Sequence, residues 1–175
     1  MIEFSVEKSV AVLERTPFVI EMLLRDLPDD WTMNNEGGST WSPFDIVGHF
    51  IYGEKTDWIP RMKIILSDNG NKSFEPFDRF AQMMESEGKT LSDLLIEFKL
   101  RRKASIEILR SMNITEEKLK RTGIHPVFGK VTLRELLATW TAHDLNHIGQ
   151  IARVMALQYK REVGPWIEFL RILKN

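Results

Sequence analysis

The chain has 175 residues, of which 43% are hydrophobic and 28% are charged, and its formal net charge is −1. These values are ordinary for a globular protein and predict one domain that spans residues 1–175. The near-zero net charge argues against nucleic acid as the main partner, because affinity for phosphates depends on clustered lysine and arginine.

The sequence contains no cysteine, which excludes disulfides, cysteine-ligated zinc and catalysis by a thiol of the chain itself. Any transition metal must therefore be bound mainly by nitrogen and oxygen ligands. The N-terminal residues MIEFSVEKSV lack the basic start and apolar run of a secretory signal, and no stretch is long and apolar enough to cross a membrane. We expect a cytoplasmic protein, and the lack of cysteine is compatible with that location.

Four long segments have the apolar spacing of amphipathic helices. The first runs from about Ser5 to Leu27, and Pro17 within it predicts a kink or break near Thr16, because proline lacks the N–H that a helix interior needs. The second begins at Ser42-Pro43-Phe44-Asp45, whose serine, proline and acid suit the N-cap, N1 and N3 positions. It ends at the turn sequence SDNGNKS.

Pro60 is expected to kink the last turns of the second segment. Residues Phe74 to Gly88 are expected to form a partly ordered loop with one helical turn. The third long segment opens with a capping box, Thr90-Leu91-Ser92-Asp93, and ends near Asn113. It carries a basic run, expected to be a solvated helix face, that consists of Lys99, Arg101, Arg102 and Lys103.

Residues Thr115 to Lys118 are expected to form a short helix, followed in RTGIHPVFGKVTLRE by a turn or a short hairpin-like connection. A third capping box, Thr132-Leu133-Arg134-Glu135, opens the fourth long segment, which runs to about Tyr159. A last short helix is expected over Trp166 to Leu173. Four amphipathic helices, each with one apolar face, predict an all-α fold, a four-helix bundle with short extra helices.

The most informative residues are His143 and His147, four residues apart in the fourth segment. Side chains at this spacing lie on one helix face with Cβ atoms about 5–6 Å apart, so both imidazoles can bind one divalent metal from the same side. Both fall on the apolar stripe that contains Trp140 and Ile151, which predicts that they face the bundle interior. His49, in the second segment, is expected to be inward or at the bundle rim. Three histidines without a fourth protein ligand leave coordination positions open, as in catalytic metal sites.

The histidines alone allow other interpretations. A lone inward histidine is usually a hydrogen-bonded core residue, and an HxxxH pair can arise by coincidence. The zincin motif H-E-x-x-H is absent, because Asp144 follows the first histidine of the pair.

Three stretches add weight to the metal interpretation: GHFIYGEKTDWIPR, HPVFGKVTLRELLATWTAHDLNHIGQIARVM and GPWIEFLRIL. On these the chain resembles the DinB-like, or YfiT-like, superfamily of metal-dependent enzymes over almost all residues after position 40, and HDLNHIGQI is the specific part. The resemblance implies a four-helix bundle with a long crossover between its second and third helices. It also implies a three-histidine metal site at His49, His143 and His147, and a homodimer.

Some members of this superfamily are S-transferases or isomerases that depend on low-molecular-weight thiols, and many have no assigned activity. Three neutral imidazoles leave a divalent ion its full charge, which favours hydroxide, thiolate or carboxylate as the fourth ligand. We therefore expect a metal-dependent enzyme acting on a small-molecule substrate, either a low-molecular-weight-thiol S-transferase or a hydrolase. The alternatives are a non-catalytic metal-binding protein and a helical interaction protein whose histidines are structural. The metal stays open among zinc, nickel, iron, cobalt and manganese.

Gln150, His125 and Asp144 are the remaining candidates for a catalytic role. Gln150 lies on the same stripe one turn beyond His147, where it is the better candidate to orient an imidazole. Asp144 lies about 100° from His143 around the helix, which favours a surface or interhelix contact over a role in the site. His125 is expected to serve turn structure; the alternatives are a position at the pocket mouth, proton donation and metal ligation.

Overall fold

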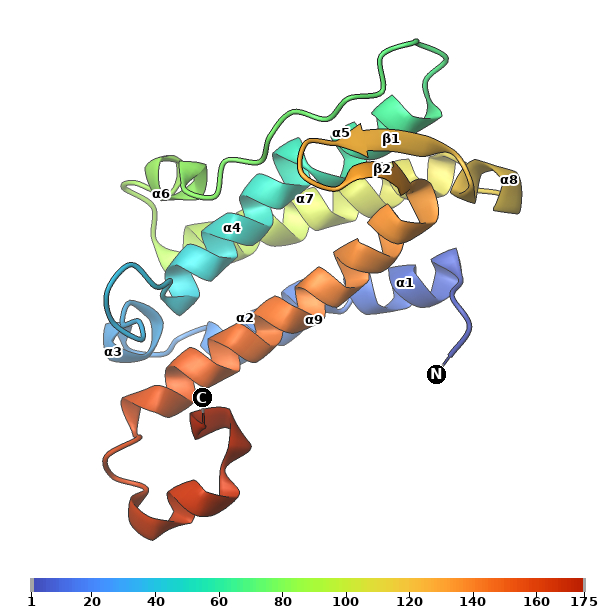
Figure 1. Ribbon diagram of the computed structural model, residues 1–175. Coiled ribbons are helices and arrows are strands. Elements are labelled where there is room, and N and C mark those ends of the chain that lie inside the picture. Colours follow the sequence, from blue (N-terminus) through green and yellow to red (C-terminus); the bar gives the residue numbers. More distant parts are fainter. Residues whose placement is uncertain (1, 175) are drawn as a thin grey trace.

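The computed structural model describes residues 2–174 and is built mainly of helices (Figure 1). Four columns form the bundle: α1 and α2 in line, α4 and α5 in line, α7, and α9. The elements in chain order are α1 Val6–Leu13, α2 Thr16–Leu24, α3 Asp29–Thr32, α4 Pro43–Thr56, α5 Trp58–Leu66, α6 Ala81–Glu85, α7 Leu91–Ser111, α8 Glu116–Leu119, β1 Thr122–His125, β2 Gly129–Thr132, α9 Leu133–Gln158, and the 3₁₀ helices η1 Gly164–Phe169 and η2 Arg171–Leu173.

Two of the four columns are broken, and a proline explains each break. Pro17 has no N–H to donate to the carbonyl of Leu13 four residues earlier, so α1 ends at Leu13 and α2 begins three residues later. In the second column Pro60 stands in the same relation to Thr56, which is the last residue of α4. The break near Pro17 is confirmed. Pro60 was expected to kink the last turns of the second segment, and the structure instead has a break at Asp57, about one turn before the proline.

Capping boxes open the three longest helices, as predicted. In Ser42–Asp45, Thr90–Asp93 and Thr132–Glu135 the first side chain accepts a hydrogen bond from the backbone of the last residue, whose carboxylate accepts one in return. Each such N-cap stabilises its helix by about 1 kcal/mol. The boxes therefore determine where α4, α7 and α9 begin.

A two-stranded antiparallel hairpin, β1 with β2, connects α8 to α9 and adds a small sheet to the predicted all-α fold. The crossover between α5 and α7 runs along the outside of the bundle and contains α6, the single helical turn expected there (Figure 1). The crossover is attached to the hairpin, because Phe74 N donates to Ile124 O and Ile124 N donates to Lys72 O, each at 2.9 Å. One wall of the molecule is thus made by two segments far apart in the sequence.

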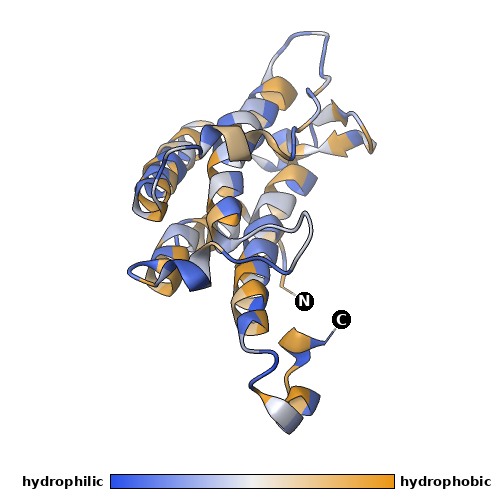
Figure 2. Ribbon diagram, turned by 90° about the vertical axis from the view of Figure 1, so that its left-hand side faces the viewer, coloured by the Kyte–Doolittle hydropathy of each residue, from blue (hydrophilic) through white to orange (hydrophobic). Residues whose placement is uncertain are grey.

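Both hydrophobic and hydrophilic residues occur along the long helices, as amphipathic helices require (Figure 2). The buried apolar side chains form two clusters. One includes Leu13, Trp58 and Trp140, at the end of the bundle where α5 and the hairpin lie. The other includes Phe50 and other side chains from α2, α4, α7 and α9.

The C-terminal segment stands away from the bundle as an arm (Figures 1 and 2). The expected last helix is instead two 3₁₀ helices, η1 and η2. The guanidinium of Arg153 ties the arm to α9 by donating to the carbonyls of Ile172 and Lys174. Within residues 2–174, no helix is both long enough and apolar enough to cross a bilayer.

Candidate metal centre

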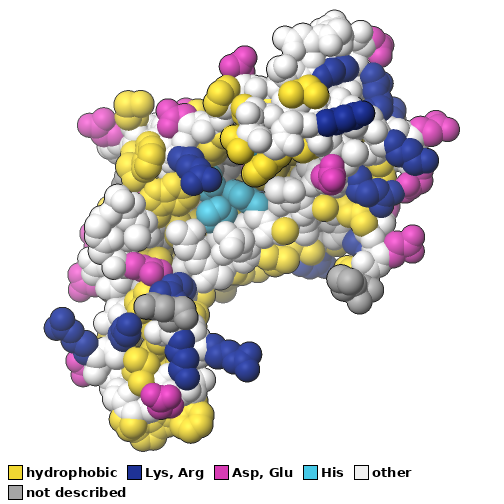
Figure 3. All heavy atoms as spheres, in the orientation of Figure 1, with side chains coloured by type: hydrophobic (Ala, Val, Ile, Leu, Met, Phe, Trp, Pro, Cys, Tyr) yellow, Lys and Arg dark blue, Asp and Glu magenta, His cyan; other side chains and the backbone are white. Residues whose placement is uncertain are grey.

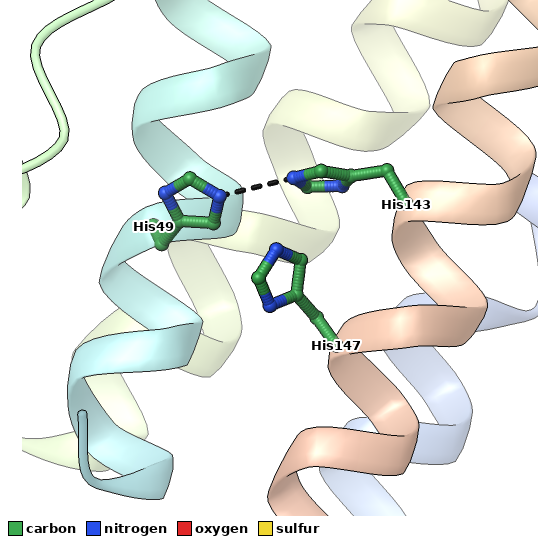
Figure 4. Close-up of side chains that lie close together, drawn as sticks. All are labelled: His49, His143 and His147. Carbon is green, nitrogen blue, oxygen red and sulfur yellow. Dashed lines mark hydrogen bonds between the residues drawn. The ribbon is translucent and has the colours of Figure 1, made fainter. Parts of the chain in front are cut away.

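The three histidines singled out in the sequence meet in the structure, His49 from α4 and His143 and His147 from α9 (Figure 4). One ring nitrogen from each lies within 4.8 Å of the other two, and Nε2 of His49 lies 3.0 Å from Nε2 of His143. Two nitrogens on a tetrahedral ion with bonds of about 2.0–2.1 Å are about 3.3 Å apart. The spacing therefore fits one shared divalent ion with positions left open.

Burial keeps two of these imidazoles neutral. It lowers the pKa of His49 to about 3, helped by the charges of its histidine neighbours and Arg79. Burial likewise lowers the pKa of His147 to about 4, against the opposing effects of Gln150 and Asp144. Neutral imidazole is the form that binds a metal, so at pH 7 these rings do not have to lose a proton first.

Gln150 orients one of the three rings. Its Oε1 lies 2.7 Å from Nδ1 of His147, so the ring donates its Nδ1–H to the amide and keeps Nε2 free as a metal ligand. The other nitrogen of His147 points toward the gap between His49 and His143 (Figure 4). Among the described residues, Nδ1 of His49 and Nδ1 of His143 are buried without a hydrogen-bond partner.

The cluster lies at the floor of a cavity of about 1060 Å³. Figure 3 shows the histidine side chains in a hollow on this face, bordered by hydrophobic and basic side chains. The walls come from the segment before α4, from α4 and α5, from the crossover, from the hairpin tip and from α9. Ligand cavities of small-molecule enzymes are typically about 300–1,000 Å³, so the hollow can hold a substrate of ordinary size.

The model of the DinB superfamily matches residues 13–151, most of the chain. The chain belongs to the DinB superfamily. A solved structure with the same fold is YfiT from Bacillus subtilis, described as a probable metal-dependent hydrolase with an unusual four-helix bundle topology. It superposes with a TM-score of 0.70 at 19% sequence identity, covering 93% of this chain and 92% of YfiT. No curated protein is similar enough in sequence to count as a match.

In this DinB-superfamily chain Asp144 makes the interhelix contact that its position favoured. It is fully buried, and its Oδ1 lies 3.7 Å from Nδ1 of His143, longer than a hydrogen bond. Its hydrogen bonds come from Arg102 on α7, at 3.1 Å from Nη2. Burial alone would raise the pKa of Asp144, but the charge of Arg102 and the hydrogen bonds to it lower that pKa instead.

The sequence interpretation was wrong for Arg102, which is not part of a solvated face but only 1% exposed. Its Nε donates to Glu54 Oε1 and its Nη1 to the carbonyl of Leu13, each at 2.8 Å. That carbonyl needs a donor because Pro17 cannot supply the helical one. Arg102 thus donates hydrogen bonds both to the free carbonyl at the end of α1 and to two buried carboxylates. Burial raises the pKa of Glu54 despite its contact with Arg102.

A signal for the burial of Arg102 is present in the sequence of α7. Leu95, Phe98, Ile106 and Leu109 are buried and recur at helical spacing, and Arg102 continues that stripe. The neighbouring Lys99, Arg101 and Lys103 favour a surface position in the sequence and so obscure this signal. Glu54, Arg102 and Asp144 form what we call the polar layer, which separates the two apolar clusters beside the histidines.

His125 does serve turn structure, as expected. Its Nδ1 accepts hydrogen bonds from the backbone N–H of Val127 and Phe128, at 3.1 and 3.2 Å, and its ring stacks on Phe128. It lines the cavity at the hairpin tip. Its ring nitrogens are not among the converging ligand atoms of His49, His143 and His147.

Proposed function

We propose that this chain is a metal-dependent enzyme in which His49, His143 and His147 bind a divalent ion at the floor of a substrate cavity. The observation that carries the proposal is the convergence of three ring nitrogens within 4.8 Å at an open cavity. YfiT, which has the same fold, is described as a probable metal-dependent hydrolase, and this supports the proposal. The metal is one that accepts three imidazoles, such as zinc, nickel, iron or manganese.

When bound by His49, His143 and His147, a divalent ion would supply a nucleophile near neutral pH, because it would lower the pKa of a water or thiol in its open position. The protein's contributions follow from its own residues. Burial holds His49 and His147 neutral, Gln150 fixes the ring of His147, and the cavity walls bind and orient the substrate. We favour hydrolysis as the reaction.

Transfer to a low-molecular-weight thiol is the second candidate. The cavity, at about 1060 Å³, has room for a thiol and an electrophile together. The chain has no cysteine of its own, so the thiol would have to come from outside. The two reactions share the same three histidines and differ in which nucleophile occupies the open position.

The test is replacement of His147 by alanine in protein purified without an affinity tag. We expect about one divalent ion per wild-type chain, loss of the ion in His147→Ala, and a loss of activity in screens of ester and amide hydrolysis and of thiol transfer. His125→Ala is the matched control, because it removes a cavity histidine outside the cluster, and it should keep the ion.

Two outcomes would overturn the proposal. A wild-type chain that binds no ion from added zinc, nickel, iron or manganese would make the histidines structural. A wild-type chain that binds an ion and is inactive in every screen, with a melting temperature that collapses in His147→Ala, would make the metal a stabiliser of the bundle.

The homodimer and the cytoplasmic location remain predictions. Light scattering of the purified chain measures the first, and fractionation of cells that express it measures the second. We further propose that the partner of the site is a small molecule rather than nucleic acid, in line with the formal net charge of −1.

A further inference from the structure

Arg79, in the crossover, brings an exposed guanidinium to the cavity wall. Its charge is close enough to help lower the pKa of His49. Within residues 2–174 no carboxylate forms an ion pair with it. Arg61, the other cavity arginine, is buried, paired with Asp57 and bonded to the carbonyl of Glu75. Arg79 is therefore the cavity cation left available for a ligand.

The acids that line the cavity are already engaged. Asp57 is paired with Arg61. The carboxylate of Glu135 accepts hydrogen bonds from the amide and hydroxyl of Thr132 in the capping box, and Glu135 lies about 12 Å along the helix axis from His143. Asp78, next to Arg79 in the chain, accepts a hydrogen bond from the backbone N–H of Phe80 at 2.9 Å and is not among the residues that line the cavity. A divalent ion at the histidines would add to the positive charge that Arg79 brings to the cavity wall. Such a field attracts an anionic ligand.

The same part of the cavity is aromatic. The rings of Trp41 and Phe77 lie 4.7 and 5.4 Å from the ring of His49, centroid to centroid. At the rim Phe80 is 59% exposed and Phe128 is 76% exposed, one on the crossover and one on the hairpin tip. Exposed aromatic side chains around a cavity mark a surface that an apolar partner covers. A small inorganic anion would leave these four rings uncovered.

We propose that the site takes an amphipathic organic acid, whose ring-bearing apolar body packs against Trp41, Phe77, Phe80 and Phe128 and whose carboxylate is bound by Arg79 beside the histidines. A guanidinium matches a carboxylate by two parallel hydrogen bonds. The inference rests on the proposed function for the reaction at the histidines. Binding of the acid by Arg79 and the aromatic walls does not itself require the ion.

The test uses the full chain, zinc-free and zinc-loaded, titrated with 3-phenylpropionate and indole-3-acetate and with their uncharged amides. Binding is followed by ligand-observed nuclear magnetic resonance. The variants are Arg79→Gln, Arg79→Lys and, as control, Lys103→Gln on the exposed face of α7. In the zinc-free wild type we expect each acid to bind at least about tenfold more tightly than its amide, as a charge-assisted hydrogen bond implies.

Arg79→Gln should remove that preference, Arg79→Lys should keep part of it, and Lys103→Gln should leave it unchanged. Equal affinity for acid and amide in the wild type, an unchanged preference in Arg79→Gln, or no binding of any probe would overturn the inference. Failure of the proposed function would give a different experimental result from failure of this inference. A chain that binds no metal but prefers the acids through Arg79 would keep the inference and lose the metal-dependent enzyme.

Discussion

Gln150 acts on the candidate site through a single hydrogen bond, to Nδ1 of His147 at 2.7 Å. Outer contacts of this kind fix the orientation of a metal-binding imidazole, and losing one typically costs about 10–100-fold in metal affinity. We expect Gln150→Leu to weaken zinc binding by that factor, measured by competition with a chelating dye. Gln158→Leu, on the same helix, is the control, because its amide bonds to the carbonyl of Val154. Equal zinc affinity in the two variants would contradict this role.

We expect Arg102 to contribute more to the free energy of unfolding than any exposed arginine of the chain. In Arg102→Met the buried carboxylates of Glu54 and Asp144 lose their shared cation, and unpaired buried charges cost about 3–5 kcal/mol. Arg101→Met removes a neighbouring exposed ion pair and should cost under about 1 kcal/mol. Urea unfolding at pH 7 measures both. A similar decrease in the free energy of unfolding in Arg102→Met and Arg101→Met would show that the polar layer is not ionised.

The residues of the site differ in how far the sequence could predict them. The i, i+4 spacing of His143 and His147 and the helical stripe placed these side chains and Gln150 on one face before any coordinates. The apolar stripe of α7 indicates that Arg102 is buried but not which groups it binds, because these are the Leu13 carbonyl and two acids from other helices. Such long-range compensation leaves no local pattern.

At the scale of the helix, Gly149 is a weak point in α9. A Cβ added there meets nothing within 4 Å, and glycine in a helix interior costs about 0.5–1 kcal/mol relative to alanine. We expect Gly149→Ala to raise the midpoint of thermal unfolding. Gly123→Ala in β1 should do the opposite, because its Cβ would lie 2.5 Å from Cε1 of Phe74, and such overpacking costs about 1–3 kcal/mol. A lower midpoint for Gly149→Ala would mean that the surface of α9 at Gly149 is covered and has no room for the added methyl group.

Helix starts were predictable and some helix ends were not. A capping box is a local signal, and all three predicted boxes form as expected. The clash and missing donor of Pro60 act on the turn before it, so the second column breaks at Asp57 rather than beyond the proline. The four-residue helix α3 and the 3₁₀ turns of the C-terminal arm were missed or misassigned. Such short elements depend on packing more than on periodicity.

At the scale of the whole molecule, the buried histidines make the stability of the metal-free protein depend on pH. The pKa values of His49 and His147 in the fold, about 3 and about 4, lie below the unfolded value of about 6.5. The unfolded chain therefore binds protons first. Stability is fully present above about pH 6.5 and is lost as pH falls from there toward 4, by up to about 1.4 kcal/mol per pH unit for each ring.

Urea unfolding of the zinc-free protein between pH 7.5 and 4.5 measures this loss. The His49→Gln variant has one fewer ring to protonate, so its free energy of unfolding should fall less steeply with decreasing pH over the same range. Identical slopes in the wild type and the variant would mean that other groups carry the pH dependence.

The bundle could be predicted from the sequence, but the cavity could not. Four apolar faces require a common core, and this leads to a helical bundle whatever the loops do. The walls of the cavity come from Trp41, from the crossover around Phe77 and Arg79 and from the hairpin tip at Phe128. Their placement depends on contacts between segments that no local pattern links.

The two backbone hydrogen bonds that join Phe74 and Lys72 to Ile124 bear on how ligands reach the histidines. They join a short piece of the crossover to the edge of the hairpin, so the segments that carry Arg79 and Phe128, both of which line the cavity, are tied to each other. Separating the crossover from the hairpin at this point would require breaking both bonds, whereas a displacement of the two segments together would leave the bonds in place.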